Sequence, residues 1–460
     1  MKILLSHGYF LADDPKEQAI MRPYPPLGIL YLSAYLKRKG IAAEVYDTTF
    51  STKEAFRAYV LQNRPSFLAL YVNLMTKLNI LETIQWVRSE ERLKQTRIIL
   101  GGPEVTHHDE AFLRAGADFI ITGEGEVTLY DLLTTVDNAF SPFLDVVEGI
   151  SFINVRGEIV RTKQRDKIKD IDTLPMPDRD AIDLRLYFNA WKERHGYSAA
   201  SINTMRGCPY TCKWCSRAVY GLSYRRRSPK LVVAELAVIQ QKYSVDSFWF
   251  VDDVFTISHK WLTSFAEELM LKGIEIRYEC ITRADRMNAE VVELLEQTGC
   301  FRVWIGAESG SQRVIDLMDR RVQVTQVRDM IHLAQANGIE AGTFIMLGYP
   351  GETAEDIEQT AEHLISSDPD IFTITVAYPI KGTPMYEEVE PEFLKSLPWE
   401  SSTDRDQDFK RQYPREYYDH AVRYVVNKVN AAKARKRGKR VESWKLGLKA
   451  WVSKRRMGRF

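Results

Sequence analysis

Short apolar runs alternate with helical patterns along residues 1–140 of this 460-residue chain. Residues 27–39 repeat apolar positions at helical spacing, and Gly40 marks the end of that helix. The runs that predict strands are 3–5, 43–46, 67–72, 98–100 and 119–121. Strands that alternate with helices in this way predict an α/β fold with a doubly wound, Rossmann-like parallel sheet, which binds ligands beyond the carboxyl ends of its strands.

The same alternation resumes at residue 201 and continues to about residue 390. The runs that predict strands in this part are 202–204, 247–250, 276–280, 301–305, 342–346 and 371–376. Each is followed by loop and helix signals, which gives six βα units in series. The chain is therefore expected to contain a second α/β unit.

The remaining residues lie between and after these two units. Residues 149–160 predict a hairpin, and residues 172–178, with two prolines, predict an extended linker. We expect four segments: 1–140, a linker with a hairpin at 141–200, the second α/β unit at 201–390, and a mostly helical, basic segment at 391–460.

The composition is that of a globular chain with two or three domains, since 45% of its residues are hydrophobic. Lys and Arg number 63 against 62 Asp and Glu, and a net charge of +1 gives no general attraction to nucleic acid, so no such partner is expected. No apolar run approaches the roughly 18 residues that span a bilayer, and the amino terminus has no signal-peptide pattern. We expect a cytoplasmic protein.

The chemistry of the chain is concentrated in Cys208, Cys212 and Cys215, which have CxxxCxxC spacing. Three thiolates at this spacing can hold three irons of a 4Fe-4S cubane and leave the fourth iron without a protein ligand. A structural zinc site would need a fourth ligand, and the remaining Cys280 and Cys300 form no second pair. Disulfides are not expected in a long, cysteine-poor chain.

With Gly207 before the first cysteine and Trp214 before the last, this motif resembles that of the radical S-adenosylmethionine (SAM) superfamily. The resemblance implies that the methionine part of SAM chelates the open iron, and that the reduced cluster cleaves SAM to a 5′-deoxyadenosyl radical. It also implies a partial (β/α)6 barrel at 201–390, whose loops after the strands build the active site. An electron donor such as flavodoxin or ferredoxin is the implied partner.

Residues 1–140 resemble the cobalamin-binding domain that precedes the barrel in one branch of that superfamily. The similar motifs imply cobalamin as a third cofactor, bound through Pro26, Gly28, Gly101, Gly102, Gly123, Glu124 and Gly125. The Asp-x-His-x-x-Gly motif that supplies a lower axial ligand is absent, because the corresponding residues read Ser6-His7-Gly8. We expect His7 to be a hydrogen-bonded structural residue; the alternative for the whole domain is a Rossmann-like fold without a ligand.

Further SAM contacts are implied where the predicted barrel strands end. Asp252 or Asp253 would receive the methionine amino group, unless the pair only caps the next helix. Arg283 would bind the methionine carboxylate, or else form a salt bridge at the barrel rim. The remaining implied contacts are Trp214 beside the cluster, Glu308 and Ser309 in a Gly-x-Glu-Ser-Gly motif, and Gly348 beside the adenosine.

Two basic stretches have open interpretations. The three arginines at 225–227 predict either a solvated rim or a site for an anionic substrate. Residues 423–460 contain 14 Lys or Arg and one acidic residue, Glu442, interleaved with Trp444 and Trp451. This composition suits a helix at an anionic membrane surface, a solvated tail, or contact with RNA phosphates; membrane contact would favour a hydrophobic or lipid-like substrate.

Methylation of an unactivated carbon through methylcobalamin is the function that the resemblance favours. The first alternative is an oxidative cyclase or rearrangement enzyme with the same cofactors and no net methyl transfer. A tRNA methylthiotransferase would bring three further amino-terminal cysteines, whereas this chain has none before Cys208, and a non-catalytic iron-sulfur carrier would need no barrel. The sequence predicts a small-molecule substrate but no acid, base or radical relay for it, since such groups lie on variable loops.

Overall fold

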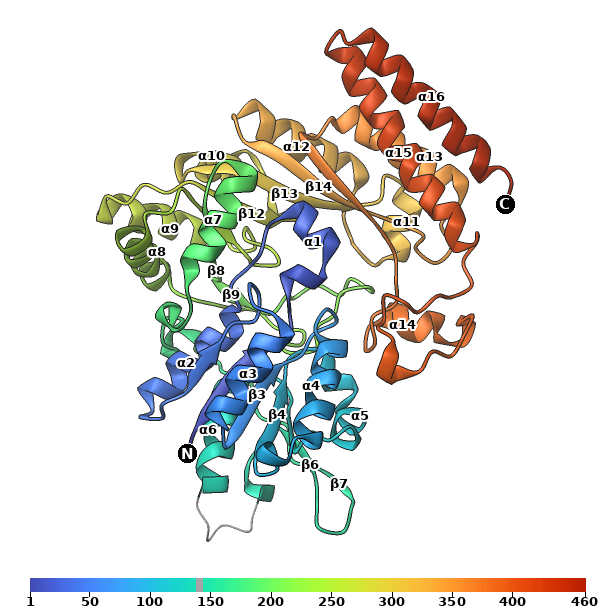
Figure 1. Ribbon diagram of the computed structural model, residues 1–460. Coiled ribbons are helices and arrows are strands. Elements are labelled where there is room, and N and C mark those ends of the chain that lie inside the picture. The colour runs from blue at the N-terminus through green and yellow to red at the C-terminus, as the bar shows by residue number, and fades with distance from the viewer. Residues whose placement is uncertain (138–143) are drawn as a thin grey trace.

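The amino-terminal unit is built on a seven-stranded sheet, in a computed structural model that describes residues 1–137 and 144–460 (Figure 1). Strands β1 to β5 pair in parallel, which confirms the predicted doubly wound sheet. The predicted hairpin forms as β6 and β7 and adds two antiparallel strands to the sheet edge, so the sheet extends beyond residue 140. In spatial order the strands are β2 (Glu44–Tyr46), β1 (Ile3–His7), β3 (Phe67–Tyr71), β4 (Arg97–Gly101), β5 (Phe119–Ile121), β6 (Ile150–Ile153) and β7 (Ile159–Arg161).

Helices cover both faces of this sheet, because consecutive strand residues point to opposite sides. Ile3 and Leu5 pack in one core and Leu4 packs in the other. The strand order reverses between β1 and β3, and a doubly wound sheet opens its ligand crevice at this point. The covering helices are α2 (Leu27–Arg38) and α6 (Gly125–Asp137) on the first face, and α3 (Lys53–Asn63), α4 (Lys77–Ser89) and α5 (Asp109–Arg114) on the second.

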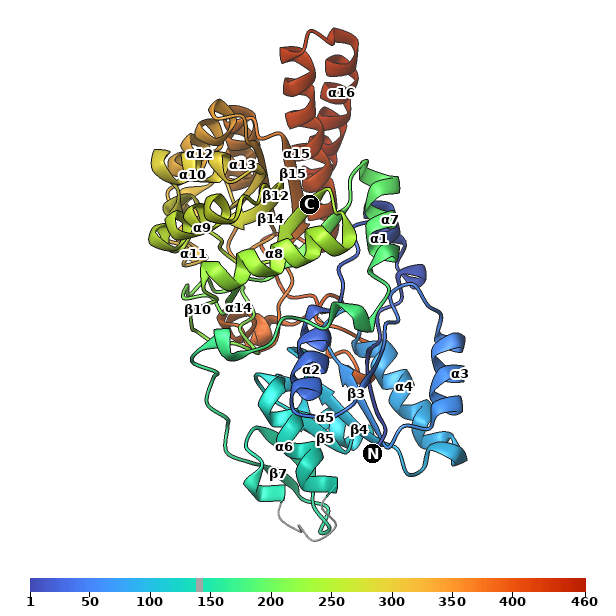
Figure 2. The same ribbon diagram turned by 90° about the vertical axis from the view of Figure 1, so that its left-hand side faces the viewer.

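The second unit is an open sheet of six parallel strands covered by helices, which confirms the expected partial barrel (Figures 1 and 2). In spatial order its strands are β15 (Ile371–Val376), β14 (Glu340–Leu347), β13 (Cys300–Glu308), β12 (Tyr278–Thr282), β11 (Ser247–Phe250) and β8 (Ala199–Ile202). The helices between them are α8 (Pro229–Tyr243), α9 (His259–Lys272), α10 (Ala289–Gln297), α11 (Gln312–Leu317), α12 (Val324–Ala336) and α13 (Ala354–Ser367).

Short elements connect the two units. After α14 (Pro384–Val389) the chain returns to the amino-terminal unit, where the Trp399 and Phe112 rings meet edge to face at 4.7 Å between centroids. Lys77 donates a hydrogen bond to the Ser402 carbonyl there, at 2.9 Å. Further helices within and between the units are α1 (Pro15–Ile20), α7 (Leu184–His195), η1 (Leu11–Asp13), η2 (Glu91–Leu93), η3 (Glu104–His107), η4 (Leu144–Val146), η5 (Ile171–Thr173), η6 (Arg179–Ala181), η7 (Ala284–Arg286), η8 (Glu390–Glu392) and η9 (Trp399–Ser401).

The basic carboxy-terminal segment folds into a helical hairpin that projects from the barrel, away from the amino-terminal unit (Figures 1 and 2). It consists of α15 (Arg415–Lys436) and α16 (Arg440–Met457). Val425 and Val429 of α15 are fully buried in the barrel core, so the interpretation of residues 423–460 as a solvated tail is wrong. Across residues 1–137 and 144–460, no helix combines the length and the apolar character that crossing a membrane requires.

Gly310, in the motif that follows β13, allows this loop to lie directly on α13. A Cβ at this position would lie 2.5 Å from the Thr360 Cα and 2.7 Å from the Gln359 carbonyl oxygen. We predict that Gly310→Ala lowers the free energy of unfolding of the apo protein by roughly 1–3 kcal/mol, because backbone atoms must move. Urea unfolding followed by circular dichroism measures this change.

Gly447 provides the matched control for that substitution. It lies inside α16, and a Cβ there would meet no atom within 4 Å. Gly447→Ala should therefore stabilise the chain by up to about 1 kcal/mol through helix propensity. Equal stability of the Gly310→Ala variant and the wild type would contradict the close approach of loop and helix.

Candidate active site

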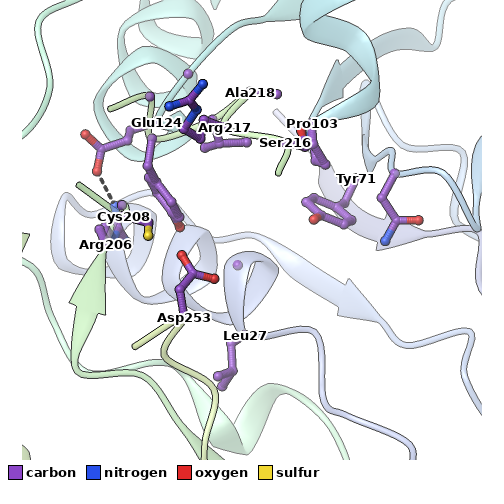
Figure 3. A pocket seen from close by; sticks show the side chains of 18 of the residues that line it. Leu27, Tyr71, Pro103, Glu124, Arg206, Cys208, Ser216, Arg217, Ala218 and Asp253 are labelled. Atoms are coloured by element: carbon purple, nitrogen blue, oxygen red, sulfur yellow. Dashed lines mark hydrogen bonds and ion pairs between the residues drawn. The ribbon is translucent and has the colours of Figure 1, made fainter. Parts of the chain in front are cut away.

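One cavity of about 890 Å³ lies where the carboxyl ends of the two sheets face each other. Tyr71, Gly101 and Ile121 line it from the ends of β3, β4 and β5, and Thr282 and Glu308 line it from the ends of β12 and β13. Figure 3 shows Cys208 and Asp253 on one side of this space and Tyr71 and Pro103 on another. Residues predicted for two different cofactors therefore share one chamber.

All three cysteines of the CxxxCxxC motif line this cavity. They lie on a loop that leaves β9 (Met205–Arg206) and returns at β10 (Arg225–Arg226), two short strands that pair with each other. We call residues 207–224 the cysteine loop. Among residues 1–137 and 144–460, no three His, Cys, Asp or Glu side chains converge on a single metal ion. A cubane takes one thiolate per iron, so its cysteines need not converge on one point.

Two buried arginines lie beside the middle cysteine. Nη1 of Arg283 lies 3.6 Å from Cys212 Sγ, and Nη1 of Arg320 lies 3.8 Å from the same sulfur. Arg283 also pairs with Asp285 at 2.7 Å, which is the salt bridge expected as its alternative role. Cationic donors at this distance stabilise a thiolate. Arg320 could not be predicted from the sequence, because it follows a short helix and not a strand.

Two carboxyl groups reach the cavity beside the cysteines. Glu308 follows a bulge in β13 and has φ of +65°, a left-handed conformation that is costly for a residue with a side chain. Burial raises its pKa, although Arg320 at 3.7 Å opposes that shift. The pKa of Asp253 is raised by burial and by neighbouring Asp252. Both carboxyl groups therefore line the same cavity as the three cysteines.

Three residues predicted to contact SAM do not line the cavity. Asp252 is fully buried and accepts hydrogen bonds from the backbone N–H groups of Thr204, at 2.7 Å, and Met205, at 3.1 Å. It thus fixes the turn after β8 and does not cap the next helix. Ser309 accepts from the Ser311 N–H at 3.1 Å. Gly348, with φ of +78°, shapes the loop after β14.

The predicted cobalamin motifs line the opposite side of the cavity. Gly102 has φ of +113°, and a Cβ there would lie 2.4 Å from the Val72 carbonyl oxygen. A Cβ at Gly28 would meet no atom within 4 Å, which leaves open space above the backbone. Pro26, Gly101, Gly123 and Gly125 also line this side. Bare backbone at strand ends fits a large, flat ligand such as a corrin.

His7 lies outside this lining and is hydrogen-bonded as a structural residue. Its Nε2 lies 2.9 Å from Asp47 Oδ1, and its Nδ1 lies 3.1 Å from Thr48 Oγ1. Asp47 also accepts from the hydroxyl of Tyr187, at 2.7 Å. The histidine therefore joins β1 to the segment after β2.

The three arginines at 225–227 form neither a solvated rim nor an open anion site. Arg225 pairs with Glu124 at 2.6 Å, and Arg227 pairs with Glu235 at 2.6 Å. Arg226 stacks on Trp261, 3.5 Å from the ring centroid. Both interpretations from the sequence are wrong, because each guanidinium has a partner inside the protein.

Comparison with known families matches each of the two sides of the cavity to a known type of domain. The radical SAM superfamily matches residues 202–364, and the B12 binding domain matches residues 20–133. These matches fall on the barrel and on the first sheet. The chain belongs to the cobalamin-dependent branch of the radical SAM superfamily. The cofactors of this radical SAM enzyme are a 4Fe-4S cluster, SAM and cobalamin.

Relatives of this radical SAM enzyme include both methyltransferases and cyclases. An uncharacterized methyltransferase, PH0819, of Pyrococcus horikoshii is 27% identical, with 88% of this chain and 87% of the relative covered. The anaerobic magnesium-protoporphyrin IX monomethyl ester cyclase of Rubrivivax gelatinosus is 26% identical, with coverages of 85% and 70%. The solved structure of the radical enzyme OxsB, with aqua-cobalamin and SAM bound, matches with a TM-score of 0.67 and 20% identity, over 84% of this chain and 54% of OxsB. That match shows the shared fold.

Glu352, which lies close to the site, makes the stability of this radical SAM enzyme depend on pH. Oε2 accepts from the Gly348 N–H at 2.6 Å, and Oε1 has no hydrogen-bond partner among the described residues. Burial raises the pKa of this carboxyl to about 8. Its folded-state pKa therefore exceeds the unfolded value of about 4.3, so its contribution to stability is full below that value and is lost as pH rises toward 8.

We predict that Glu352→Gln, which cannot ionise, stabilises the protein by roughly 2–4 kcal/mol at pH 8 relative to its effect at pH 4. Urea unfolding at both pH values measures the difference. Glu355→Gln, at an exposed position on the same turn, is the control and should show no such dependence. A Glu352→Gln effect that is independent of pH would contradict the burial of an ionisable carboxyl.

Proposed function

We propose that this enzyme methylates an unactivated carbon of a small, largely apolar substrate. The observation that carries the proposal is the single cavity, in which the cysteine loop faces the glycine-rich ends of the first sheet. Both cofactors can then act on one bound molecule without its release. Much of the remaining lining is apolar, including Leu27, Leu32, Leu70, Ile99 and Phe344, which suits a substrate with few charges.

The residues of the cavity divide into two groups by the ligand that they would hold. Cys208, Cys212 and Cys215 would ligate the cluster, and Asp253, Glu308 and Arg283 would orient the amino acid part of SAM beside it. Gly28, Gly101, Gly102, Gly123 and Gly125 would let the corrin approach the backbone. When bound, the reduced cluster supplies the electron that cleaves SAM, and cobalamin supplies the methyl group.

Oxidative cyclisation without methyl transfer is the second candidate. A cyclase and a methyltransferase match this chain at 26% and 27% identity, a difference too small to decide between them. The products separate the two reactions. S-adenosylhomocysteine formed together with 5′-deoxyadenosine would support methyl transfer, and 5′-deoxyadenosine alone would support cyclisation or rearrangement.

Cluster ligation by the cysteine loop gives a direct prediction. Cys215→Ala should lower the release of 5′-deoxyadenosine by at least about 100-fold in anaerobically reconstituted, reduced protein, because the open iron needs an intact cluster. Chromatography of the nucleosides formed from SAM measures this loss. Cys300→Ala, which alters a buried thiol in the barrel core, is the control and should retain the activity. Undiminished release by Cys215→Ala would contradict the assignment.

An electron must reach the cluster from outside the chain, since radical SAM enzymes act with a reductant on small-molecule substrates. We propose a small electron-transfer protein of the flavodoxin or ferredoxin class as the donor. Cys215 is the exposed member of the cysteine trio, whereas Cys212 is buried.

We also propose that α16 binds an anionic membrane surface. The helix packs its small residues Ser443, Ala450 and Ser453 inward. Met457 at its end is also buried, but the two tryptophans face solvent: Trp444 is 68% exposed and Trp451 is 56% exposed. A helix that only stabilised the fold would place its large apolar side chains inside.

The positive charge of α16 supports an anionic bilayer as the partner that this face binds. Lys439, Arg440, Lys445 and Lys449 line a surface hollow of about 540 Å³ on the same helix. Basic residues beside exposed tryptophans are typical of helices that lie on anionic lipid headgroups. A lipid-like substrate is the class that such a location would favour.

The membrane proposal predicts flotation with vesicles of phosphatidylcholine and phosphatidylglycerol, but not with phosphatidylcholine alone. Changing Trp444 and Trp451 together to Gln should lower the bound fraction by roughly tenfold, because the apolar anchor is lost. Met270→Gln with Leu271→Gln, which removes two exposed apolar side chains of α9, is the control. Flotation of the tryptophan variant at the wild-type level would contradict the proposal.

A further inference from the structure

We infer that Glu124 of the cobalamin-binding unit holds together the two ends of the cysteine loop, at Arg206 and Arg225. We call these two ends the neck of the loop and the contact with Glu124 the clamp. The clamp positions the cluster relative to cobalamin. The inference deepens the proposed function and rests on it for the identity of the cluster loop. From the sequence, Glu124 was expected to touch cobalamin. Glu124 does line the cavity, but both of its carboxylate oxygens accept from arginines at the two ends of the loop, which points to a positioning role.

The cysteine loop has a narrow neck. Arg206 and Arg225 lie opposite each other in the β9–β10 pair, and the whole loop lies between them in sequence. Gly207, just inside the neck, has φ of +82°, and a Cβ there would lie 2.3 Å from Ser223 Oγ. The two ends of the loop are thus in contact, and whatever holds the neck holds all three cysteines.

A single carboxylate binds both sides of this neck. Glu124 Oε1 accepts from Nη1 of Arg206 at 2.7 Å, and Oε2 accepts from Nη1 of Arg225 at 2.6 Å. Figure 3 shows the first of these contacts as a dashed line. The other arm of Arg206 donates to Glu126 Oε1 at 2.5 Å. Two carboxylates from the first unit therefore neutralise two guanidinium groups from the barrel.

The clamp lies in the protein interior, where its charges interact strongly. The side chains of Glu124 and Arg206 are 5% and 4% exposed, and that of Arg225 is 10% exposed. Tyr220 of the cysteine loop and Tyr31 of α2 lie against Arg206, at 5.5 and 5.3 Å from its guanidinium carbon. Removing one member of such a cluster leaves a buried charge unpaired, so the geometry resists change.

The position of Glu124 in the chain links the clamp to the second cofactor. Its neighbours Gly123 and Gly125 line the cobalamin side of the cavity. The backbone that would support the corrin and the side chain that holds the neck thus belong to the same three residues. This arrangement fixes the separation between the two cofactors, which radical transfer and methyl transfer to one substrate both require.

Hydrogen–deuterium exchange of the cysteine loop tests the clamp without requiring turnover. We predict that Glu124→Gln and Arg225→Gln each raise the exchange of residues 207–224 by roughly tenfold, and that the double variant adds little, because either change breaks the same link between the two sides of the neck. The strands of both sheets should exchange as in the wild type. The control is Glu148→Gln, which breaks an exposed pair with Lys163 in the same unit.

Two outcomes of the exchange experiment would overturn the clamp: unchanged exchange in the loop, or a rise spread equally over both units. A titration with cobalamin followed by absorbance separates the clamp from the role expected from the sequence. The clamp predicts a Kd for Glu124→Gln within about twofold of the wild type. A large loss of affinity with an unchanged loop would show that Glu124 is a cobalamin contact. Failure of nucleoside release would refute the proposed function but leave the exchange result intact.

Discussion

Parallel strands place all their following loops at one edge of a sheet, and this constraint governs the whole molecule. The protein contains two such sheets, and their carboxyl edges face each other across one cavity. Because of this arrangement, loops that are 100 or more residues apart in sequence reach one chamber, as those of Gly101 and Cys208 do. Both proposed cofactor sites therefore follow from the way in which the carboxyl edges of the two sheets face each other.

Within that chamber, burial and charge pairing set the properties of the polar side chains beside the cysteines. Arg283 and Arg320 surround the Cys212 sulfur, and Glu308 is held in a left-handed conformation that the bulge in β13 imposes. These groups are unfavourable to bury alone and are tolerated because each has an opposite charge or a hydrogen-bond partner nearby. The same principle explains Arg225, which pairs with Glu124 across the junction of the two units.

The sequence alone was sufficient to predict local features such as strands. It failed to predict features that depend on contacts between residues far apart in the chain. Strands rich in β-branched residues were predicted well, but β8 was placed three residues late because Ala199, Ala200 and Ser201 lack an apolar signature. Asp252 and Asp253 could not be separated, since adjacent residues point in different directions only once the strand end is fixed. The partner of Glu124 lies 82 residues away, and no local pattern reveals it. Which face of α16 is exposed likewise depends on its packing against α15.

Two sheets that face each other across one cavity require the cluster and cobalamin to bind in that cavity, on opposite sides of it. Electron paramagnetic resonance of protein that holds both the reduced cluster and cob(II)alamin tests it most directly, because two unpaired spins in one chamber broaden and split each other's signals. A shared cavity predicts a spectrum that differs from the sum of the spectra of singly loaded samples. A doubly loaded spectrum equal to that sum would contradict it.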